Sequence, residues 1–101
     1  MQLYRHGDLL VQSDHHLPSE AKRLQHLVLA EGELTGHSHR IAEKDAAVLY
    51  RTELGELFLQ VTAKQATLVH QEHGPIVLGT GIYSIWRQRE YSPREIRVVR
   101  D

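Results

Sequence analysis

The chain has 101 residues, with 12 basic and 13 acidic side chains and a formal net charge of −1. This length predicts a single domain over residues 1–101, and the balanced charge excludes a strongly basic coat for nucleic acid. Hydrophobic residues make up 41% and charged residues 25%, which is typical of a globular domain and not of a disordered one. No cysteine is present, so disulfide bonds, thiolate metal sites and a cysteine nucleophile are excluded.

The N-terminal segment MQLYRHGDLL is too polar for a signal peptide. No apolar run approaches the roughly 18 residues that a membrane-spanning helix needs. Together with the lack of cysteine, these features predict a cytoplasmic protein without membrane contact. A domain of this size buries only about 60–70% of the surface of its unfolded chain, so a homodimer or a bound metal ion would add stability.

Alternation of apolar and polar residues with a period of two dominates the chain and predicts strands. The first two are expected over 2–5 and 8–12, separated by His6-Gly7. Segment 18–31 is ambiguous, because Pro18-Ser19-Glu20 is typical of a helix start, whereas 27–30 suits a buried strand. We expect one short helix near 19–25, followed by a strand.

The second half of the chain predicts further strands over 46–52, 56–62, 66–71, 82–91 and 95–100. Residues 53–55 between the first two suit a hairpin turn, and Gly74-Pro75, Gly79-Thr80-Gly81 and Ser92-Pro93 interrupt the others. Several short strands with frequent glycines predict an all-β fold, as a single antiparallel β-roll, barrel or sandwich.

Eight histidines stand out in this composition, because histidine titrates near neutrality and is the commonest metal ligand. Four of them share no period, and we expect these to be surface or loop residues: His6, His15, His16 and His26. The other four form two close pairs, His37 with His39 and His70 with His73.

His37 and His39 are two residues apart, so in a strand they point to the same face as Ile41. That face is the more apolar one, and imidazoles directed into an apolar interior are unfavourable without a partner. A metal ion, a carboxylate or a substrate would serve. Glu43, four residues after His39, could supply an oxygen.

His70 shares its face with Ala66 and Leu68, whereas Gly74-Pro75 bends the chain beside His73, so either histidine could join the first pair. Three neutral imidazoles are typical of a catalytic metal centre with open positions. The sequence therefore predicts a divalent metal site, with Zn, Fe, Mn, Ni and Cu all compatible. Its candidate ligands are His37, His39, His70 and His73, with Glu43 or Glu72 as the proton acceptor.

The segment His37-Ser38-His39-Arg40-Ile41-Ala42-Glu43 has the form HxHxxxE. It resembles the first metal-binding motif of the cupins, small β-barrels in which two histidines and a glutamate bind a metal together with a further histidine. The resemblance covers this motif only. It implies a cupin-like barrel in which His37, His39 and Glu43 are ligands and His73 or His70 is the last one, and it implies no particular reaction.

Two other functions are compatible with these residues. The first is a metal-independent ribonuclease or phosphoryl-transfer enzyme, in which two histidines act as general base and acid. Its phosphate contacts would come from Arg40, Arg87 or Arg89, with Tyr83 as a hydrogen-bond donor. The second is a non-catalytic binding or assembly module.

The segment 87–101 carries five arginines against three acidic residues. Arginine favours bidentate contacts with phosphate or carboxylate, and the neighbouring aromatic side chains could stack on bases. The substrate could therefore be a small molecule or RNA, and whether the protein is an enzyme stays open.

Overall fold

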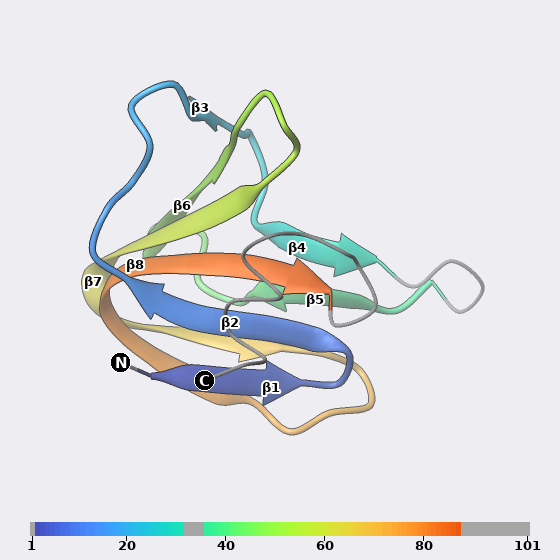
Figure 1. Cartoon of the computed structure of the whole chain (residues 1–101). Helices are drawn as coiled ribbons and strands as arrows, with labels where there is room; N and C mark the ends of the chain where they lie inside the picture. Colours follow the sequence, from blue (N-terminus) through green and yellow to red (C-terminus); the bar gives the residue numbers. More distant parts are fainter. Residues whose placement is uncertain (1, 32–35, 88–101) are drawn as a thin grey trace.

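The structure, a computed structural model, describes residues 2–31 and 36–87. These residues form one eight-stranded sheet, curled into a half-barrel, in which every strand pair is antiparallel (Figure 1). The strands are β1 (Leu3–His6), β2 (Leu9–Asp14), β3 (Lys22–Arg23), β4 (Val28–Glu31), β5 (Ser38–Ile41), β6 (Ala47–Arg51), β7 (Leu57–Val69) and β8 (Ile76–Arg87). The described residues contain no helix that is long and apolar enough to cross a membrane.

The main path of the sheet runs β1-β2-β8-β7-β5-β4, and β6 adds to β7 with β3 beside it. The long strand β7 makes this branching possible. Its first half pairs with β6 and its end pairs with β5, while β8 follows it on the other side.

A β-bulge in the middle of β7 explains how one strand serves two neighbours. The register with β8 shifts between Val61 and Gln65, so several residues of β7 lie opposite Thr80. The hydroxyl of Thr80 donates a hydrogen bond to the carbonyl oxygen of Ala63 within this stretch. Extra residues in one strand bend it and increase its twist, and the sheet therefore curls instead of staying flat.

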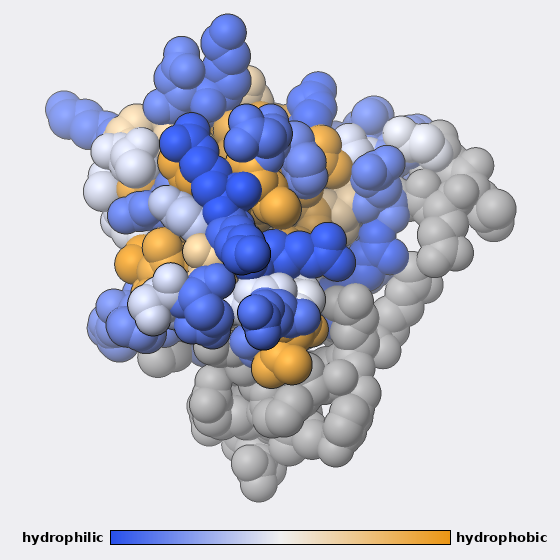
Figure 2. Space-filling view, turned by 90° about the horizontal axis from the view of Figure 1, so that it is seen from above, coloured by the Kyte–Doolittle hydropathy of each residue, from blue (hydrophilic) through white to orange (hydrophobic). Residues whose placement is uncertain are grey.

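The inner face of the half-barrel is filled by apolar side chains, which alternate with more exposed ones along β5 and β6, whereas β2 and β8 also contain consecutive buried residues. Seven leucine and valine side chains of this core are at most 1% exposed: Leu9, Val11, Leu49, Leu59, Val61, Leu68 and Leu78. Seen from above, the outer surface is mostly hydrophilic, with apolar groups visible in gaps between polar side chains (Figure 2). The period-two pattern of the sequence thus selects which face is buried.

The all-β antiparallel fold predicted from the sequence is confirmed. The predicted turn at 53–55 is also present, where the amide of Gly55 donates to the carbonyl of Thr52. The predicted strands over 56–62 and 66–71 are one strand, β7, and the strand predicted over 82–91 begins earlier, at Ile76. The predicted strand over 95–100 lies outside the described residues.

Two local predictions are wrong. No helix forms near 19–25, because Lys22 and Arg23 instead pair with Arg51 and Tyr50 of β6, so that backbone hydrogen bonds in the sheet replace those of a helix. The segment Gly79-Thr80-Gly81 is not a turn between strands, because it continues β8 opposite the bulge of β7.

Candidate metal centre

Five imidazoles gather at one end of the half-barrel. They are His6 at the end of β1, His37 just before β5, His39 on β5, and His70 and His73 after β7. We call these five residues the histidine cluster. Their ring centroids lie 4.3 Å apart for His39 and His70, 4.7 Å for His70 and His73, and 4.9 Å for His6 and His39. Segments that are far apart in the sequence thus supply one compact site.

The hairpin between β1 and β2 brings His6 to the cluster. His6 pairs with Leu9, which leaves Gly7 and Asp8 as a two-residue turn. Gly7 has a φ of 65°, and glycine at the first position of such a turn is typical of type II′ hairpins. A Cβ atom at Gly7 would lie 2.6 Å from Nε2 of His73 and 3.3 Å from Cε1 of His39. The site therefore requires glycine here both for backbone conformation and for space.

Hydrogen bonds assign the protons on His6 and His39. Nε2 of His6 lies 2.9 Å from the carbonyl oxygen of Gly74, which only accepts, so Nε2 carries the proton. Nδ1 of a neutral His6 then accepts a hydrogen bond from Nδ1 of His39, at 2.8 Å. Because Nδ1 of His39 is the donor, the lone pair of His39 is on Nε2.

Two carboxylates flank the cluster. Oδ1 of Asp8 lies 3.7 Å from Nε2 of His39, and Oε1 of Glu72 lies 3.5 Å from Nδ1 of His37. Both carboxylate side chains are substantially exposed, whereas the imidazole of His39 is buried. The cluster thus combines buried nitrogen donors with oxygen donors at its rim.

Burial keeps the central imidazoles neutral. Desolvation, followed by repulsion from the neighbouring imidazoles, lowers the pKa of His39 to about 4. Desolvation is also the largest cause that lowers the pKa of His6 and that of His70. At pH 7 these rings are therefore uncharged, which is the form that binds a metal ion.

The loop after β7 is fixed to the cluster by its own polar groups. Nδ1 of His70 accepts a hydrogen bond from the amide of Glu72, at 3.0 Å, so a neutral His70 carries its proton on Nε2. The amide of Ser38 donates to the side-chain oxygen of Gln71, at 3.0 Å, which ties β5 to this loop. His73 is exposed and its ring is stacked at 6.0 Å from that of His39.

Glu43, the acidic residue of the HxHxxxE motif, is held elsewhere. Its two carboxylate oxygens accept hydrogen bonds from the amide and the hydroxyl of Thr67, at 2.8 and 2.7 Å. Thr67 lies between Ala66 and Leu68, which are fully buried in the core, so the Thr67 side chain points to the opposite face of β7. The structure therefore separates Glu43 from the histidines that precede it in the motif.

Of the residues proposed for phosphate contacts, the structure describes Tyr83 and Arg87 on β8 and Arg40 on β5. Tyr83 is 5% exposed, and its hydroxyl donates to the carbonyl oxygen of Gly79, at 2.7 Å. Burial raises the pKa of Tyr83. Arg40 is exposed on the face opposite to His39, and the guanidinium of Arg87 donates to the carbonyl of Glu31. Arg89 lies outside the described residues.

The interpretation of His6 as a surface or loop residue is wrong, because its side chain is buried, with 2% exposure. Sequence spacing also missed Gly7 and Asp8. The available signal was that His6-Gly7-Asp8 lies between two predicted strands, so it could have been read as a hairpin turn that presents polar groups at one end of the sheet.

One family of known sequences matches the part of the chain that contains this site. A model described as a domain of unknown function, DUF8820, matches residues 5–88. The chain belongs to the DUF8820 family. All five histidines of the cluster fall within the DUF8820 domain.

No curated protein matches the DUF8820 chain, and no solved structure matches it. Over residues 2–31 and 36–87, no group of three or more His, Asp or Glu side chains stands so that it could hold a metal ion. Donor atoms are thus present at one end of the fold, but within the described residues no three of them point at one common position.

Proposed function

We propose that the histidine cluster binds one divalent transition-metal ion, with Nε2 of His39 as its central donor. The observation that carries this proposal is the hydrogen-bond chain from His39 through His6 to the carbonyl of Gly74. Metal-binding histidines usually donate their other N–H to a fixed acceptor, which sets the tautomer and the ring orientation. His6 is such an acceptor for His39.

Further donors would come from the exposed side chains around His39. Oδ1 of Asp8 lies 3.7 Å from Nε2 of His39, which carries the lone pair. One ion could bridge these two atoms with bonds of about 2.0–2.2 Å. His73 is exposed, and its ring lies beside Gly7 and next to the rings of His39 and His70. Turning these two side chains would complete a three-donor site.

The hydrogen bonds favour His73 over His70 as the additional histidine. His70 uses Nδ1 to accept the amide of Glu72, so its other nitrogen carries a proton and offers no lone pair. We assign His70 a positioning role in the loop. His37, beside Glu72, lies at the edge of the site.

Imidazole and carboxylate donors suit Zn, Fe, Mn, Ni or Cu, whereas Ca²⁺ and Mg²⁺ prefer oxygen ligands alone. Such an ion supplies Lewis-acid chemistry and lowers the pKa of a bound water molecule. The rim carboxylate of Glu72, 3.5 Å from Nδ1 of His37, would then be a candidate proton acceptor from that water. A metal-dependent enzyme is thus the activity that we propose for this site.

The test is metal binding by the full-length protein prepared without a histidine tag. The metal-free protein should take up one equivalent of Zn²⁺ or Ni²⁺ in a calorimetric titration, and His39→Ala should weaken this binding at least tenfold. His6→Ala should also weaken it by about 10–100-fold, as loss of an orienting partner does. His16→Ala, in an exposed loop, is the matched control and should bind as the natural sequence does.

Equal Zn²⁺ affinity of His39→Ala and His16→Ala would overturn the proposal. Circular dichroism of each variant checks that the sheet is intact, so that loss of binding is not loss of the fold. If the folded protein takes up no ion, the histidines serve structure alone.

A further inference from the structure

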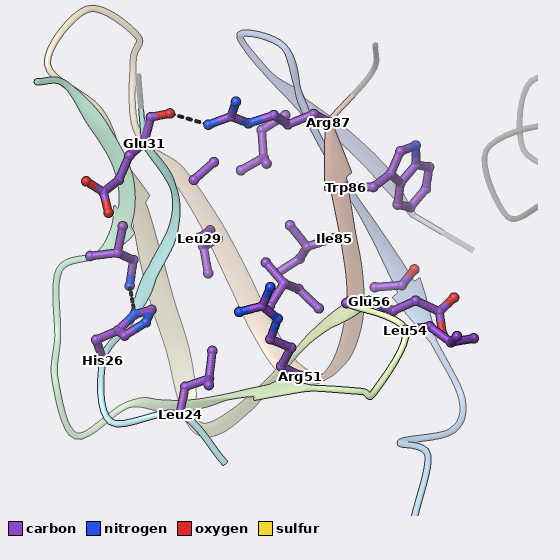
Figure 3. Close-up of a pocket in the computed structure, with 16 residues that line it drawn as sticks. Leu24, His26, Leu29, Glu31, Arg51, Leu54, Glu56, Ile85, Trp86 and Arg87 are labelled. Carbon is purple, nitrogen blue, oxygen red and sulfur yellow. Dashed lines mark hydrogen bonds between the residues drawn. The ribbon is translucent and has the colours of Figure 1, made fainter. Parts of the chain in front are cut away.

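A second candidate site lies in the half-barrel, apart from the histidine cluster. It is a cavity of about 560 Å³ between β4, β8 and the β6–β7 hairpin (Figure 3). Its floor is apolar and belongs to the core, with Leu9, Leu29 and Ile85 at most 4% exposed. No histidine of the cluster lines it.

Arg51 is the charged group that faces this space. It is the last residue of β6, and its side chain extends into the cavity (Figure 3). Within the part of the chain that the structure describes, its guanidinium makes no hydrogen bond or ion pair. Arg51 is exposed, so water solvates its guanidinium, and an anion that enters the cavity could replace this water with a bidentate contact.

The acidic residues around the cavity do not pair with the guanidinium of Arg51. Glu31 and Glu56 belong to the lining, but their carboxylates point away from the cavity (Figure 3). The second arginine of the lining, Arg87, donates to the backbone carbonyl of Glu31 and so links β8 to β4 across one end of the cavity. Arg51 is therefore the group that remains to hold a negative ligand.

We propose that this cavity binds a small amphipathic anion, with its carboxylate on Arg51 and its aliphatic body against Leu29 and Ile85. The volume is in the range of about 300–1,000 Å³ that small-molecule sites occupy, and an apolar floor with a few polar groups around it is typical of them. Leu54, at the hairpin tip, is 89% exposed and lines the mouth of the cavity, where it would cover the bound chain. This site is independent of the metal.

Decanoate is the probe for a titration calorimetry experiment on the full-length protein. We expect saturable binding with one equivalent, and at least tenfold weaker binding by Arg51→Gln. Arg23→Gln is the matched control, because Arg23 is exposed on the neighbouring strand β3 and does not line the cavity. 1-Decanol, which lacks the charge, should bind Arg51→Gln and the natural sequence equally.

Leu54→Ser should weaken decanoate binding about threefold without loss of stability, because it removes apolar contact from an exposed position. His39→Ala should leave decanoate binding unchanged, which separates this inference from the metal proposal. The inference is overturned if decanoate does not bind the folded protein, or if Arg51→Gln binds it as tightly as Arg23→Gln does.

Discussion

At the scale of single residues, the chemistry of the cluster depends on which ring nitrogen carries a proton. The carbonyl of Gly74 accepts from His6, and His6 in turn accepts from His39. A backbone atom 68 residues from His6 in sequence thus determines which nitrogen of His39 is a lone-pair donor. Asp8 then faces that nitrogen.

This proton arrangement can be measured directly. In long-range ¹H–¹⁵N spectra of the metal-free protein at pH 7.5, His39 should have its proton on Nδ1, and His6 should have its proton on Nε2. Binding of Zn²⁺ should shift the Nε2 resonance of His39 most. A His39 ring with its proton on Nε2 would contradict the hydrogen-bond chain.

Gly7 gives a second prediction at this scale. Gly7→Ala should destabilise the fold by about 1–3 kcal/mol, because alanine is strained at a φ of 65°, and its Cβ should displace His73. Zn²⁺ affinity should therefore fall at least tenfold. Both quantities can be measured by urea unfolding and by calorimetry.

Gly55→Ala is the control for backbone strain. Gly55 also has a positive φ, of 86°, but nothing lies within 4 Å of a Cβ placed there. It should lose stability as Gly7→Ala does and keep its Zn²⁺ affinity. If both variants bind the ion equally well, His73 is not a ligand.

Part of the site was predictable from the sequence. The spacing of His37, His39 and Ile41 gives their common face, and His39 and Ile41 are indeed both buried. His6 was not predictable in this way, because its contact with His39 joins residues 33 apart and depends on how the sheet curls. Local periodicity carries no information on such long-range contacts.

At the scale of elements, β7 shows why the sequence predicts strands better than their connections. Residues 62–65 interrupt the apolar alternation, and the sequence is therefore read as two strands with a gap. In the structure the same interruption is the bulge, which bends one continuous strand. The composition of Gly79-Thr80-Gly81 indicates a turn, but these residues lie opposite the bulge, where small side chains suit the distorted pairing.

The connection between β5 and β6 offers a test of the HxHxxxE motif. Glu43→Gln should leave Zn²⁺ affinity within about twofold, because Thr67 holds this side chain on the opposite face of β7. Its thermal midpoint should be slightly lower, since the amide nitrogen of glutamine cannot accept the hydrogen bond that the second carboxylate oxygen of Glu43 accepts from Thr67. A tenfold loss of Zn²⁺ affinity would instead make Glu43 a ligand, as the resemblance to cupins implies.

At the scale of the whole molecule, gathering five imidazoles links folding to pH. The pKa values of His6, His39 and His70 are lowered in the folded protein, so the unfolded chain binds more protons over this range. The contribution of these neutral imidazoles to the free energy of unfolding is therefore fully present above about pH 6.5. It is lost as the pH falls from there toward about 4, the pKa of His39.

We expect the thermal midpoint of the metal-free protein to fall by about 5 °C or more between pH 7.5 and pH 5. His39→Gln should show a smaller fall, because it removes one of the groups whose pKa is lowered. Differential scanning calorimetry with EDTA present measures both. A midpoint that stays constant over this range would mean that the cluster is solvated and easily protonated.

The strand order also bears on how the protein behaves at high concentration. Because the described sheet curls without closing, β1 and β4 are the outermost strands of its main path, and such edges can template the addition of strands from other molecules. Each has only four residues, with exposed Arg5 on β1 and exposed Glu31 on β4. A register irregularity between Val28 and Ala30 further disrupts β4. Short, charged and irregular margins therefore oppose polymerisation of an incomplete barrel.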